Sequence, residues 1–506
     1  MNFRLLMPIS LSLAALASSA PAEISLAPVF GDHAVLQCDK PVPVWGRAAA
    51  GESLTVTFRG QSVHTIAGAD GRWMVLLAAL PASAEPAELV VAGQETVVIR
   101  DVLVGEVWLA SGQSNMEWPV NLARDAAKEM SAANFPLIRQ LRVERVAAPV
   151  PADAAKTSGW TPASPETVGG FSAIGYFFAR DLHRRLGVPV GIINASWGGT
   201  ALEPWLSDTT RASTSLAATL DARWKQAQSE WPPERVARYP ADMEAWQQAE
   251  AHAKATHTKN LLPWPQPPAT DDSPARPGGT FNAMIAPLQP TALRGFLWYQ
   301  GESNVGRDAE YPELFATLIT SWRAGWGQGD LPFYFVQLPN YADGEPRGRK
   351  WARLREAQAT ALALPATAMA VAIDAGEPEN LHPTEKREVA RRLALIAKVL
   401  TYGIPGDHSG PVFESAMREG AALRVRFAHA GTGLVAHDKP VQALEIAGAD
   451  KVFHPATAKI VRDTLLVSSP AVKEPVAVRY AWSNAPLANL YNGAGLPAAP
   501  FRSDAW

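Results

Sequence analysis

Two patterns of hydrophobic and polar residues divide the 506-residue chain into three parts. Short segments of alternating apolar and polar residues, separated by glycine-containing turns, fill residues 23–100 and predict a small β sandwich. Longer apolar runs alternate with amphipathic segments across residues 101–405, which is typical of strands joined by helices. The short-strand pattern returns over residues 406–506. We therefore predict an α/β domain between an N-terminal and a C-terminal β domain.

The central part contains five apolar runs of strand length. Because helical patterns separate them, we predict a doubly wound parallel sheet of about five strands flanked by helices. Residues 206–280, rich in Ala, Gln, Glu, Pro and Trp, break this regularity and are expected to form a partly helical insertion. The predicted strands are Val102–Ala110, Val188–Asn194, Arg294–Tyr299, Phe333–Leu338 and Ala368–Ile373, and the clearest helical patterns are Phe171–Gly187 and Thr384–Tyr402.

The first apolar run ends in the sequence Ser111-Gly112-Gln113-Ser114-Asn115-Met116. A hydroxyl on a tight turn at the carboxyl end of a buried strand lies at the edge of an α/β sheet, where such sheets bind ligands. Ser114 is therefore a candidate nucleophile. The alternative is a strand followed by a serine-capped helix. The motif is not the G-x-S-x-G elbow, because Met116 occupies the place of the second glycine.

Three other strand ends in the central part carry polar residues. His382 follows the last predicted strand and a loop with three acidic residues, so we expect it at the same sheet edge as Ser114. The alternative for His382 is a surface histidine before a helix. Residues 194–200 contain adjacent glycines, and residues 299–304 offer side-chain amides. Together these groups match what a serine nucleophile needs, namely a base, an orienting acid and oxyanion donors.

Composition argues against several classes of function. The net charge of −3 gives no support for binding to nucleic acid or to an anionic membrane. The single cysteine, Cys38, excludes an intrachain disulfide framework and is expected to be a small buried residue rather than a nucleophile. Because cysteines and histidines are not clustered, we expect neither a metal nor another cofactor.

Residues 1–22 have the features of a signal peptide. Arg4 precedes a short apolar core over Leu5–Leu16, and Ala20-Pro21-Ala22 offers a cleavage site before Glu23. The apolar run is too short for a convincing membrane span. We expect an exported protein, periplasmic or secreted, that is not inserted in a membrane after cleavage.

Four motifs in order along the central part resemble the sialate O-acetylesterase family of the SGNH-hydrolase superfamily. They are GQSNM at residues 112–116, SWGGT at 196–200, WYQGESN at 298–304 and ENLHP at 379–383. The resemblance implies a flavodoxin-like sheet, with Ser114 as the nucleophile and His382 as the base. The oxyanion donors that it implies are the backbone amide of Ser114, a backbone amide of the pair Gly198 and Gly199, and the side-chain amide of Gln300.

One motif departs from the superfamily pattern, which is Asp-x-x-His. Here Glu379 stands in place of the aspartate, and its extra methylene changes the reach of the carboxylate. We expect Glu379 to orient His382, with Asp374 and Glu377 as alternatives. The residues expected to contact the substrate are Gln113, Trp197, Glu302 and Asn304.

The implied activity is that of a carbohydrate O-acetylesterase acting through an acetyl-enzyme on Ser114. The partner is then an O-acetylated carbohydrate, either a sialate or a plant polysaccharide such as xylan or xyloglucan. The glutamate at position 379 motivates an alternative of another class, a non-catalytic carbohydrate-binding protein. A peptidase using the same residues is a third interpretation.

Overall fold

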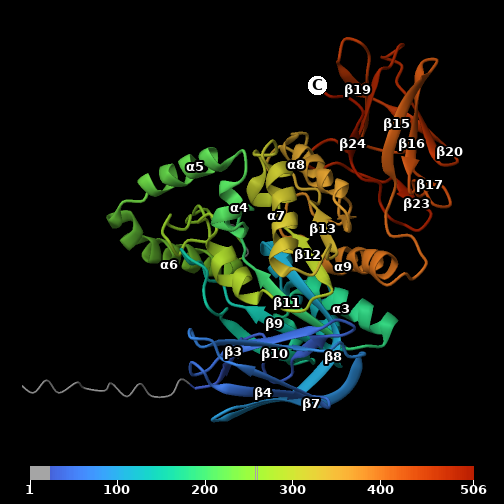
Figure 1. The fold of residues 1–506 in the computed structure, drawn as a ribbon. Coiled ribbons are helices and arrows are strands. Elements are labelled where there is room, and N and C mark those ends of the chain that lie inside the picture. Colours follow the sequence, from blue (N-terminus) through green and yellow to red (C-terminus); the bar gives the residue numbers. More distant parts are fainter. Residues whose placement is uncertain (1–22, 257, 259) are drawn as a thin grey trace, which may run out of the picture.

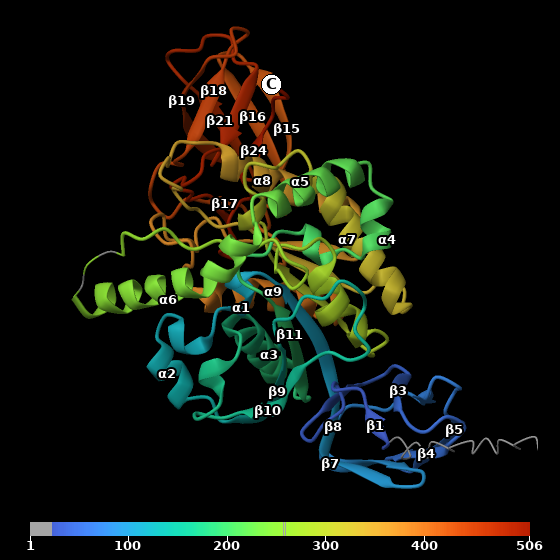
Figure 2. The same cartoon turned by 90° about the vertical axis from the view of Figure 1, so that its left-hand side faces the viewer.

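The structure is a computed structural model that describes residues 23–256, 258 and 260–506. The predicted signal peptide lies outside these residues. Strands of the N-terminal part form one end of the molecule and strands of the C-terminal part form the opposite end (Figure 1). The helices and the central sheet lie between them, as a view turned by 90° also shows (Figure 2). In the described part of the chain, no helix combines the length and the apolar character needed to cross a membrane.

From residue 23 onward, where the description begins, seven strands come before β8. In β4 and β6 most side chains alternate between buried and exposed, which is the pattern that the sequence predicts for strands with one covered face. β1, β3 and β6 form a three-stranded sheet, whereas β4 pairs with β5 and β7. The strands are β1 (Ser25–Leu26), β2 (Val35–Gln37), β3 (Val42–Arg47), β4 (Ser53–Phe58), β5 (Gln61–Ile66), β6 (Arg72–Leu77) and β7 (Ser83–Ala92).

β8 (Thr96–Gly112) connects the N-terminal strands to the central sheet as one strand of 17 residues. Residues 96–104 pair with β7, and residues 106–112 pair in parallel with β11 on one side. Residues 108–112 pair in parallel with β12 on the other side. The boundary predicted between residues 100 and 101 therefore lies inside a continuous strand, and the division into domains at that point stays a prediction.

The central sheet has the strand order β10-β9-β11-β8-β12-β13-β14. Every neighbouring pair from β9 to β14 is parallel, and β10 pairs antiparallel with β9 at the edge. The five predicted strands correspond to β8, β11, β12, β13 and β14. The bounds of the strands after β8 are β9 (Phe135–Val143), β10 (Thr157–Ala163), β11 (Val190–Ser196), β12 (Gly295–Tyr299), β13 (Phe333–Gln337) and β14 (Thr367–Val371).

β9 and β10 lie between residues 117 and 170, where the sequence pattern predicts no strand. That stretch contains several prolines, which remove hydrogen-bond donors from a strand. Pro136 is the second residue of β9, at a strand end where proline is tolerated. The sheet is therefore larger than the five strands expected.

Helices cover both faces of the central sheet. The neighbouring residues Phe333 and Tyr334 of β13 point to opposite faces, since side chains alternate along a strand. Phe333 contacts Trp322 of α7 (Tyr311–Trp326), whereas Tyr334 contacts Trp108, which packs on α3 (Ala173–Leu186). α3 also contacts α9 (Lys386–Ile396). The other helices of the central part outside residues 206–280 are α1 (Ser114–Glu117), α2 (Ala126–Ser131) and α8 (Lys350–Ala359), of which α8 contacts α7.

The described residues of the segment predicted as a partly helical insertion include three α-helices, which lie on one side of the molecule (Figure 1). They are α4 (Asp208–Ala212), α5 (Ala217–Ser229) and α6 (Pro233–Thr256). α5 buries only Leu220, so most of its surface faces solvent.

The C-terminal strands form two four-stranded sheets and a two-stranded one. Arg355 of α8 joins them to the central part: its fully buried guanidinium donates to the carbonyls of Leu338, Ser483 and Asn484 at 2.9, 2.8 and 2.6 Å. The strands are β15 (Val412–Glu419), β16 (Ala422–Ala428), β17 (Leu434–Val435), β18 (Leu444–Ala447), β19 (Phe453–Pro455), β20 (Thr457–Val461), β21 (Thr464–Ser468), β22 (Ala477–Tyr480), β23 (Tyr491–Asn492) and β24 (Phe501–Arg502).

Candidate active site

Ser114 and His382 meet at the carboxyl edge of the central sheet. Ser114 is the first residue of α1, directly after β8, and His382 lies in the loop between β14 and α9. The two residues are 268 positions apart, and His382 Nε2 lies 2.9 Å from Ser114 Oγ. This is the geometry that a nucleophile and its base require. The structure thus brings together the two residues on which the sequence hypothesis depends.

The backbone alone fixes where Ser114 lies. Gly112 has a φ of +134°, and a Cβ at this position would come within 2.1 Å of the carbonyl oxygen of Tyr299. The amide of Gln113 donates to that same oxygen at 3.0 Å. The ends of β8 and β12 are therefore locked together, and only glycine permits the close approach.

Trp118 holds the imidazole of His382 by stacking. The two rings lie 4.9 Å apart with an angle of 17° between their planes. The Trp118 indole is itself fixed by a hydrogen bond of 3.0 Å from Nε1 to the carbonyl of Leu122. Burial, together with the positive charge of Lys386, lowers the pKa of His382 to about 4. The imidazole is therefore neutral near pH 7 and can accept the Ser114 proton.

Glu377 organises the loop that carries His382. Its carboxylate accepts hydrogen bonds from the Thr384 amide and hydroxyl at 2.8 and 2.7 Å, and from Asn380 Nδ2 at 2.9 Å. Asn380 Oδ1 in turn accepts from the backbone amide of His382 at 3.0 Å. These bonds hold the pKa of Glu377 below its usual value although burial acts to raise it. Glu377 therefore fixes the backbone of the loop.

The structure does not bring the expected carboxylate to the imidazole. Glu379 is exposed, and in the described residues no hydrogen bond or ion pair joins it to His382. Asp374 is paired with Arg392 at 2.6 and 2.9 Å instead. None of the three acidic residues considered from the sequence thus contacts the His382 ring. The loop is short, and its Pro378–Glu379 tip turns toward solvent.

Two of the predicted oxyanion donors are occupied by other acceptors. The amide of Gly198 donates to the Glu117 carboxylate at 2.9 Å. Gln300 is fully buried, and its Nε2 donates to the Thr200 carbonyl at 3.3 Å and to Asn304 Oδ1 at 2.7 Å. The side-chain amide of Gln300 therefore stabilises the interior of its turn and is not available to a substrate in this structure.

The other two predicted donors are available. Neither the amide of Ser114 nor that of Gly199 has an acceptor within the described residues. A Cβ on Gly198 would lie 3.3 Å from the Ser114 Cβ, so the glycine pair passes close to the serine. The Ser114 and Gly199 amides are thus the oxyanion donors that this arrangement offers.

The residues expected to contact substrate differ in their surroundings. Gln113 Oε1 accepts from the amides of Gly301 and Ser303, both at 3.3 Å, so it braces the turn after β12. Asn304 is buried and donates to Glu203 at 3.2 Å, which makes it part of the same internal network. Trp197 is half-buried against the core. Glu302 accepts from Asn115 through Oε1, and its Oε2 is buried without a partner in the described part of the chain.

Sequence reasoning missed Asn115 and Lys386. Asn115 is fully buried, and its Nδ2 donates to Glu302 and to the Leu381 carbonyl, while its Oδ1 accepts from Lys386 Nζ. The signals were adjacency and spacing: Asn115 follows Ser114 directly, and Lys386 begins α9 four residues after His382. A lysine in the first turn of an amphipathic helix is normally assigned to the solvent face.

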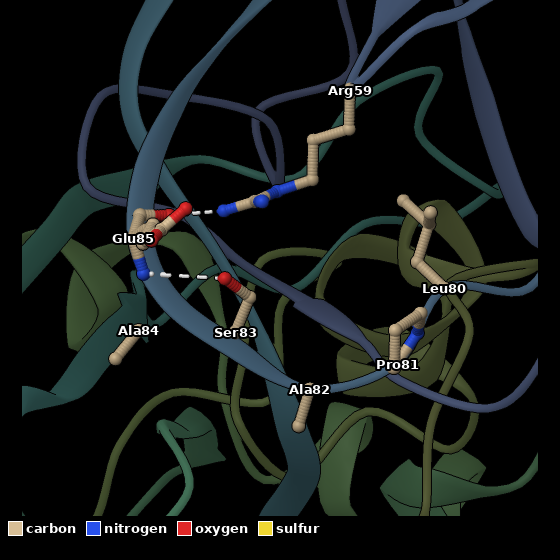
Figure 3. A pocket seen from close by; sticks show the side chains of 7 residues that line it. All are labelled: Arg59, Leu80, Pro81, Ala82, Ser83, Ala84 and Glu85. Atoms are coloured by element: carbon tan, nitrogen blue, oxygen red, sulfur yellow. Dashed lines mark hydrogen bonds between the residues drawn. The ribbon is translucent and has the colours of Figure 1, made fainter.

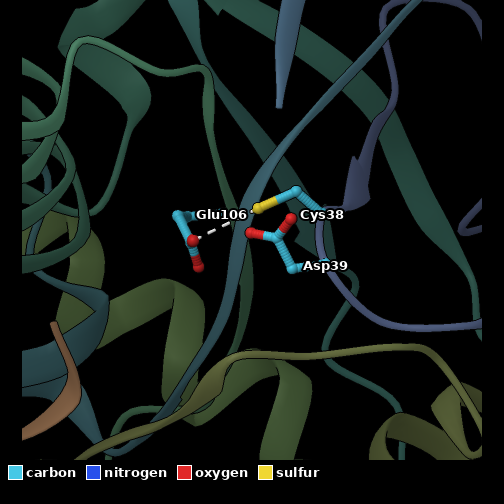
Figure 4. Close-up of side chains that lie close together, drawn as sticks. All are labelled: Cys38, Asp39 and Glu106. Carbon is cyan, nitrogen blue, oxygen red and sulfur yellow. Dashed lines mark hydrogen bonds between the residues drawn. The ribbon is translucent and has the colours of Figure 1, made fainter. Parts of the chain in front are cut away.

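Two other places with clustered polar groups lie away from Ser114. A hollow of about 710 Å³ is lined by Arg59 and residues 80–85 of the N-terminal part, where Arg59 donates to the Glu85 carbonyl (Figure 3). In Figure 4, Cys38, Asp39 and Glu106 lie close together, and the Cys38 thiol donates to Glu106 at 3.2 Å. Glu106 is already paired with Arg294 at 2.6 and 2.9 Å. Burial raises the pKa of Cys38, which accounts for it as an unreactive buried thiol.

Comparison with known proteins gives a consistent result. A family profile described as "carbohydrate esterase, sialic acid-specific acetylesterase" matches residues 104–261 and 274–398. The chain is 28% identical to the sialate O-acetylesterase of Mus musculus, covering 97% of this chain and 96% of the mouse protein. It is 30% identical to that of Rattus norvegicus, covering 71% and 70%. A crystal structure of a carbohydrate acetylesterase from Xanthomonas citri superposes with a TM-score of 0.81, at 39% identity over 96% of this chain and 100% of that one.

Proposed function

The chain belongs to the carbohydrate esterase family of sialic acid-specific acetylesterases, and on this premise we propose that it hydrolyses O-acetyl esters of a carbohydrate through a serine acyl-enzyme. The observation that carries the serine mechanism is the distance of 2.9 Å between Ser114 Oγ and His382 Nε2. Both residues lie at the carboxyl edge of a parallel sheet, where α/β proteins place their ligands.

The reaction follows from the positions of the groups. The neutral His382 accepts the proton of Ser114 as Oγ attacks the acetyl carbonyl carbon. The amides of Ser114 and Gly199 are the proposed donors to the negatively charged oxygen that forms. His382 then returns its proton to the departing sugar oxygen. In the second half, His382 removes a proton from the water that attacks the acetyl-enzyme, and it returns this proton to Ser114 Oγ as acetate leaves.

The strand order supports the SGNH-hydrolase fold that the motifs imply. If the five predicted strands are numbered along the chain, the observed order β11-β8-β12-β13-β14 becomes 2-1-3-4-5, which is the flavodoxin-like order. The point where this order reverses lies between β8 and β12. Ser114 follows one of these strands and the turn of Gln300 follows the other.

The choice between a sialate and a plant polysaccharide calls for a direct comparison. We propose an O-acetylated sialate as the first candidate, because the mouse and rat relatives are named sialate O-acetylesterases. Acetate release from an O-acetylated sialoglycan should exceed release from acetylated xylan at equal acetyl concentration. The variant Ser114→Ala should release acetate from neither. Faster release from xylan would reassign the substrate, and release by the serine variant would reject the serine mechanism.

A carbohydrate-binding protein without catalysis remains the second candidate, because no carboxylate of the described residues contacts the His382 ring. A fluorophosphonate probe separates the two functions, since it labels only an activated serine. We expect labelling of the unaltered protein and none of Ser114→Ala. A protein that binds the glycan but resists labelling would favour the second candidate.

We also propose that the protein is exported, on the strength of the signal-peptide features of residues 1–22. N-terminal sequencing of the protein recovered from its own cells should then begin at Glu23. A sequence that begins at Met1 would reject export by this route.

A further inference from the structure

A buried polar cluster, made of Asn115, Glu302 and Lys386, lies behind the Ser114–His382 pair. Asn115 is its centre, because its side chain binds both Glu302 and Lys386. Asn115 Nδ2 also donates to the carbonyl of Leu381 at 3.1 Å. The cluster therefore connects the residue that follows Ser114 to the residue that precedes His382.

Lys386 carries its ammonium group in an unusually dry place. The side chain is 1% exposed, and no carboxylate of the described residues lies within ion-pair distance of its Nζ. Its Nζ faces the rings of Trp118 and Tyr299 at 5.6 and 5.7 Å and donates to Asn115. Burial lowers the pKa of Lys386 to about 7, and the charges of Glu302 and Glu377 oppose that effect.

Trp118 links this ammonium group to the catalytic imidazole. One indole is in contact with both groups: it stacks on His382 at 4.9 Å and has Lys386 Nζ 5.6 Å from its ring. A positive charge at that position, in a region of low dielectric constant, disfavours a second positive charge on the imidazole. In the described structure no carboxylate contacts His382 to offset this effect.

We propose that Lys386 is a positioning residue that acts through His382, keeping the imidazole in its uncharged, proton-accepting form under acidic conditions. This inference rests on the proposed function, since it concerns the base of the same reaction. Asn115 and Glu302 hold the ammonium group in place. The imidazole is then a weaker base than an ordinary histidine, but it can still accept a proton from Ser114 in a more acidic medium.

The charged groups around the pair decide the sign of the effect. Lys386, on α9, acts on His382. Two carboxylates act on Lys386: Glu302, in the turn after β12, and Glu377, in the loop that carries His382. Arg124 approaches Glu377 at 4.0 Å. At pH 4 to 5 Lys386 is protonated, because that range lies below its pKa. Loss of its charge therefore raises the pKa of His382 and moves the acidic limb of the activity profile to higher pH.

The test is the pH dependence of kcat/KM for an aryl acetate, measured from about pH 3.5 to pH 8 on three variants. Lys386→Gln removes the charge but keeps a donor for Asn115, Lys386→Met removes both, and Lys386→Arg keeps the charge. We expect the acidic limb of the Gln and Met variants to move up by about one pH unit. The limb of the Arg variant should stay in place even if its rate falls. Lys350→Gln, the same change at an exposed lysine of α8, is the matched control.

A purely structural role for Lys386 would give a different result, in which all three variants lose rate and keep the wild-type limb. That result would overturn the proposal. If the Gln and Met variants do not fold, an NMR titration of the His382 ring in Ser114→Ala protein with Lys386 intact, at low and at high salt, still tests the charge. An imidazole whose pKa rises with salt toward its ordinary value supports the proposal, and one that titrates near 6.5 at low salt overturns it.

The same titration separates this inference from the proposed function. A protein that hydrolyses no acetyl ester rejects the function. Where Lys386→Gln folds, the NMR titration can be run on that variant and on the protein with the unaltered lysine, and it needs no turnover. A raised pKa of His382 in that variant would support the electrostatic role even in a protein without esterase activity.

Discussion

The two loops that bring Ser114 and His382 together are built in different ways. Backbone contacts determine the position of Ser114: Gly112 leaves no room for a side chain, and the Gln113 amide is bound to the end of β12. Side chains determine the position of His382, through Glu377, Asn380 and the ring of Trp118. A short sequence motif can specify the first kind of structure by itself. The second kind depends on contacts between distant residues.

The largest expected effect is the loss of either reacting group. Ser114→Ala and His382→Ala should each lower kcat for acetate release by at least about 10⁴-fold, because nucleophile and base act as one unit. The double variant should be little worse than either single variant. Additive losses in the double variant would show that Ser114 and His382 act separately and not as one catalytic unit.

On the serine side, the expected effect is one of stability. Gly112→Ala places a Cβ 2.1 Å from the Tyr299 carbonyl oxygen at a φ that side chains rarely adopt, so we expect the free energy of unfolding to fall by about 3 kcal/mol. Gly187→Ala is the matched control, since Gly187 ends α3 at a φ of +71° with no atom near the added Cβ. It should cost about 1 kcal/mol in the same denaturation experiment. Equal costs would mean that the contact between β8 and β12 does not fix Ser114.

On the histidine side, the expected effect is on rate. Glu377→Ala removes the acceptor for Thr384 and Asn380, so the loop loses its shape and kcat should fall by about 10- to 100-fold. Glu379→Ala tests the original sequence hypothesis at the neighbouring exposed carboxylate. We expect it to cost less than Glu377→Ala in the same kinetic assay. The opposite order would restore Glu379 as the group that orients His382.

The smallest effect is expected from the hydroxyl of Thr384. Thr384→Val removes one of the two donors from Thr384 to Glu377 and leaves the backbone donor in place. A single hydrogen bond of this kind contributes about 1 kcal/mol, so we expect kcat to fall by about fivefold or less. A loss as large as that of Glu377→Ala would show that the hydroxyl, and not the carboxylate, shapes the loop.

Which residues gather at the sheet edge could largely be predicted from the sequence, because parallel strands all end at the same edge. Five apolar runs separated by helical patterns indicate one sheet, and the polar residues after such strands must gather at one edge. That logic placed Ser114 and His382 together without any contact information. β9 was not predicted, because Pro136 and the later prolines made its segment look irregular. A proline near a strand end is nevertheless compatible with strand pairing.

The surroundings of Gln300 and Lys386 depend on burial and on long-range partners. Gln300 has the right residue type for an oxyanion donor, but Tyr311, Thr200 and Asn304 surround its amide in the interior. Lys386 has a residue type that suggests solvent, yet Asn115 and two aromatic rings enclose it. Each environment includes a partner that lies at least 100 positions away in the chain, so local pattern could not reveal it.

The guanidinium of Arg355 has a practical consequence for dissecting this protein. Its hydrogen bonds to residues 338 and 339 on one side and to residues 483 and 484 on the other are made where water has no access. In a shortened chain that ends near residue 405, the Arg355 guanidinium would lose half of its hydrogen-bond acceptors and would remain as a charge without full compensation. The last hundred residues should therefore behave as a structural support of the catalytic sheet, melting with it in a single calorimetric transition.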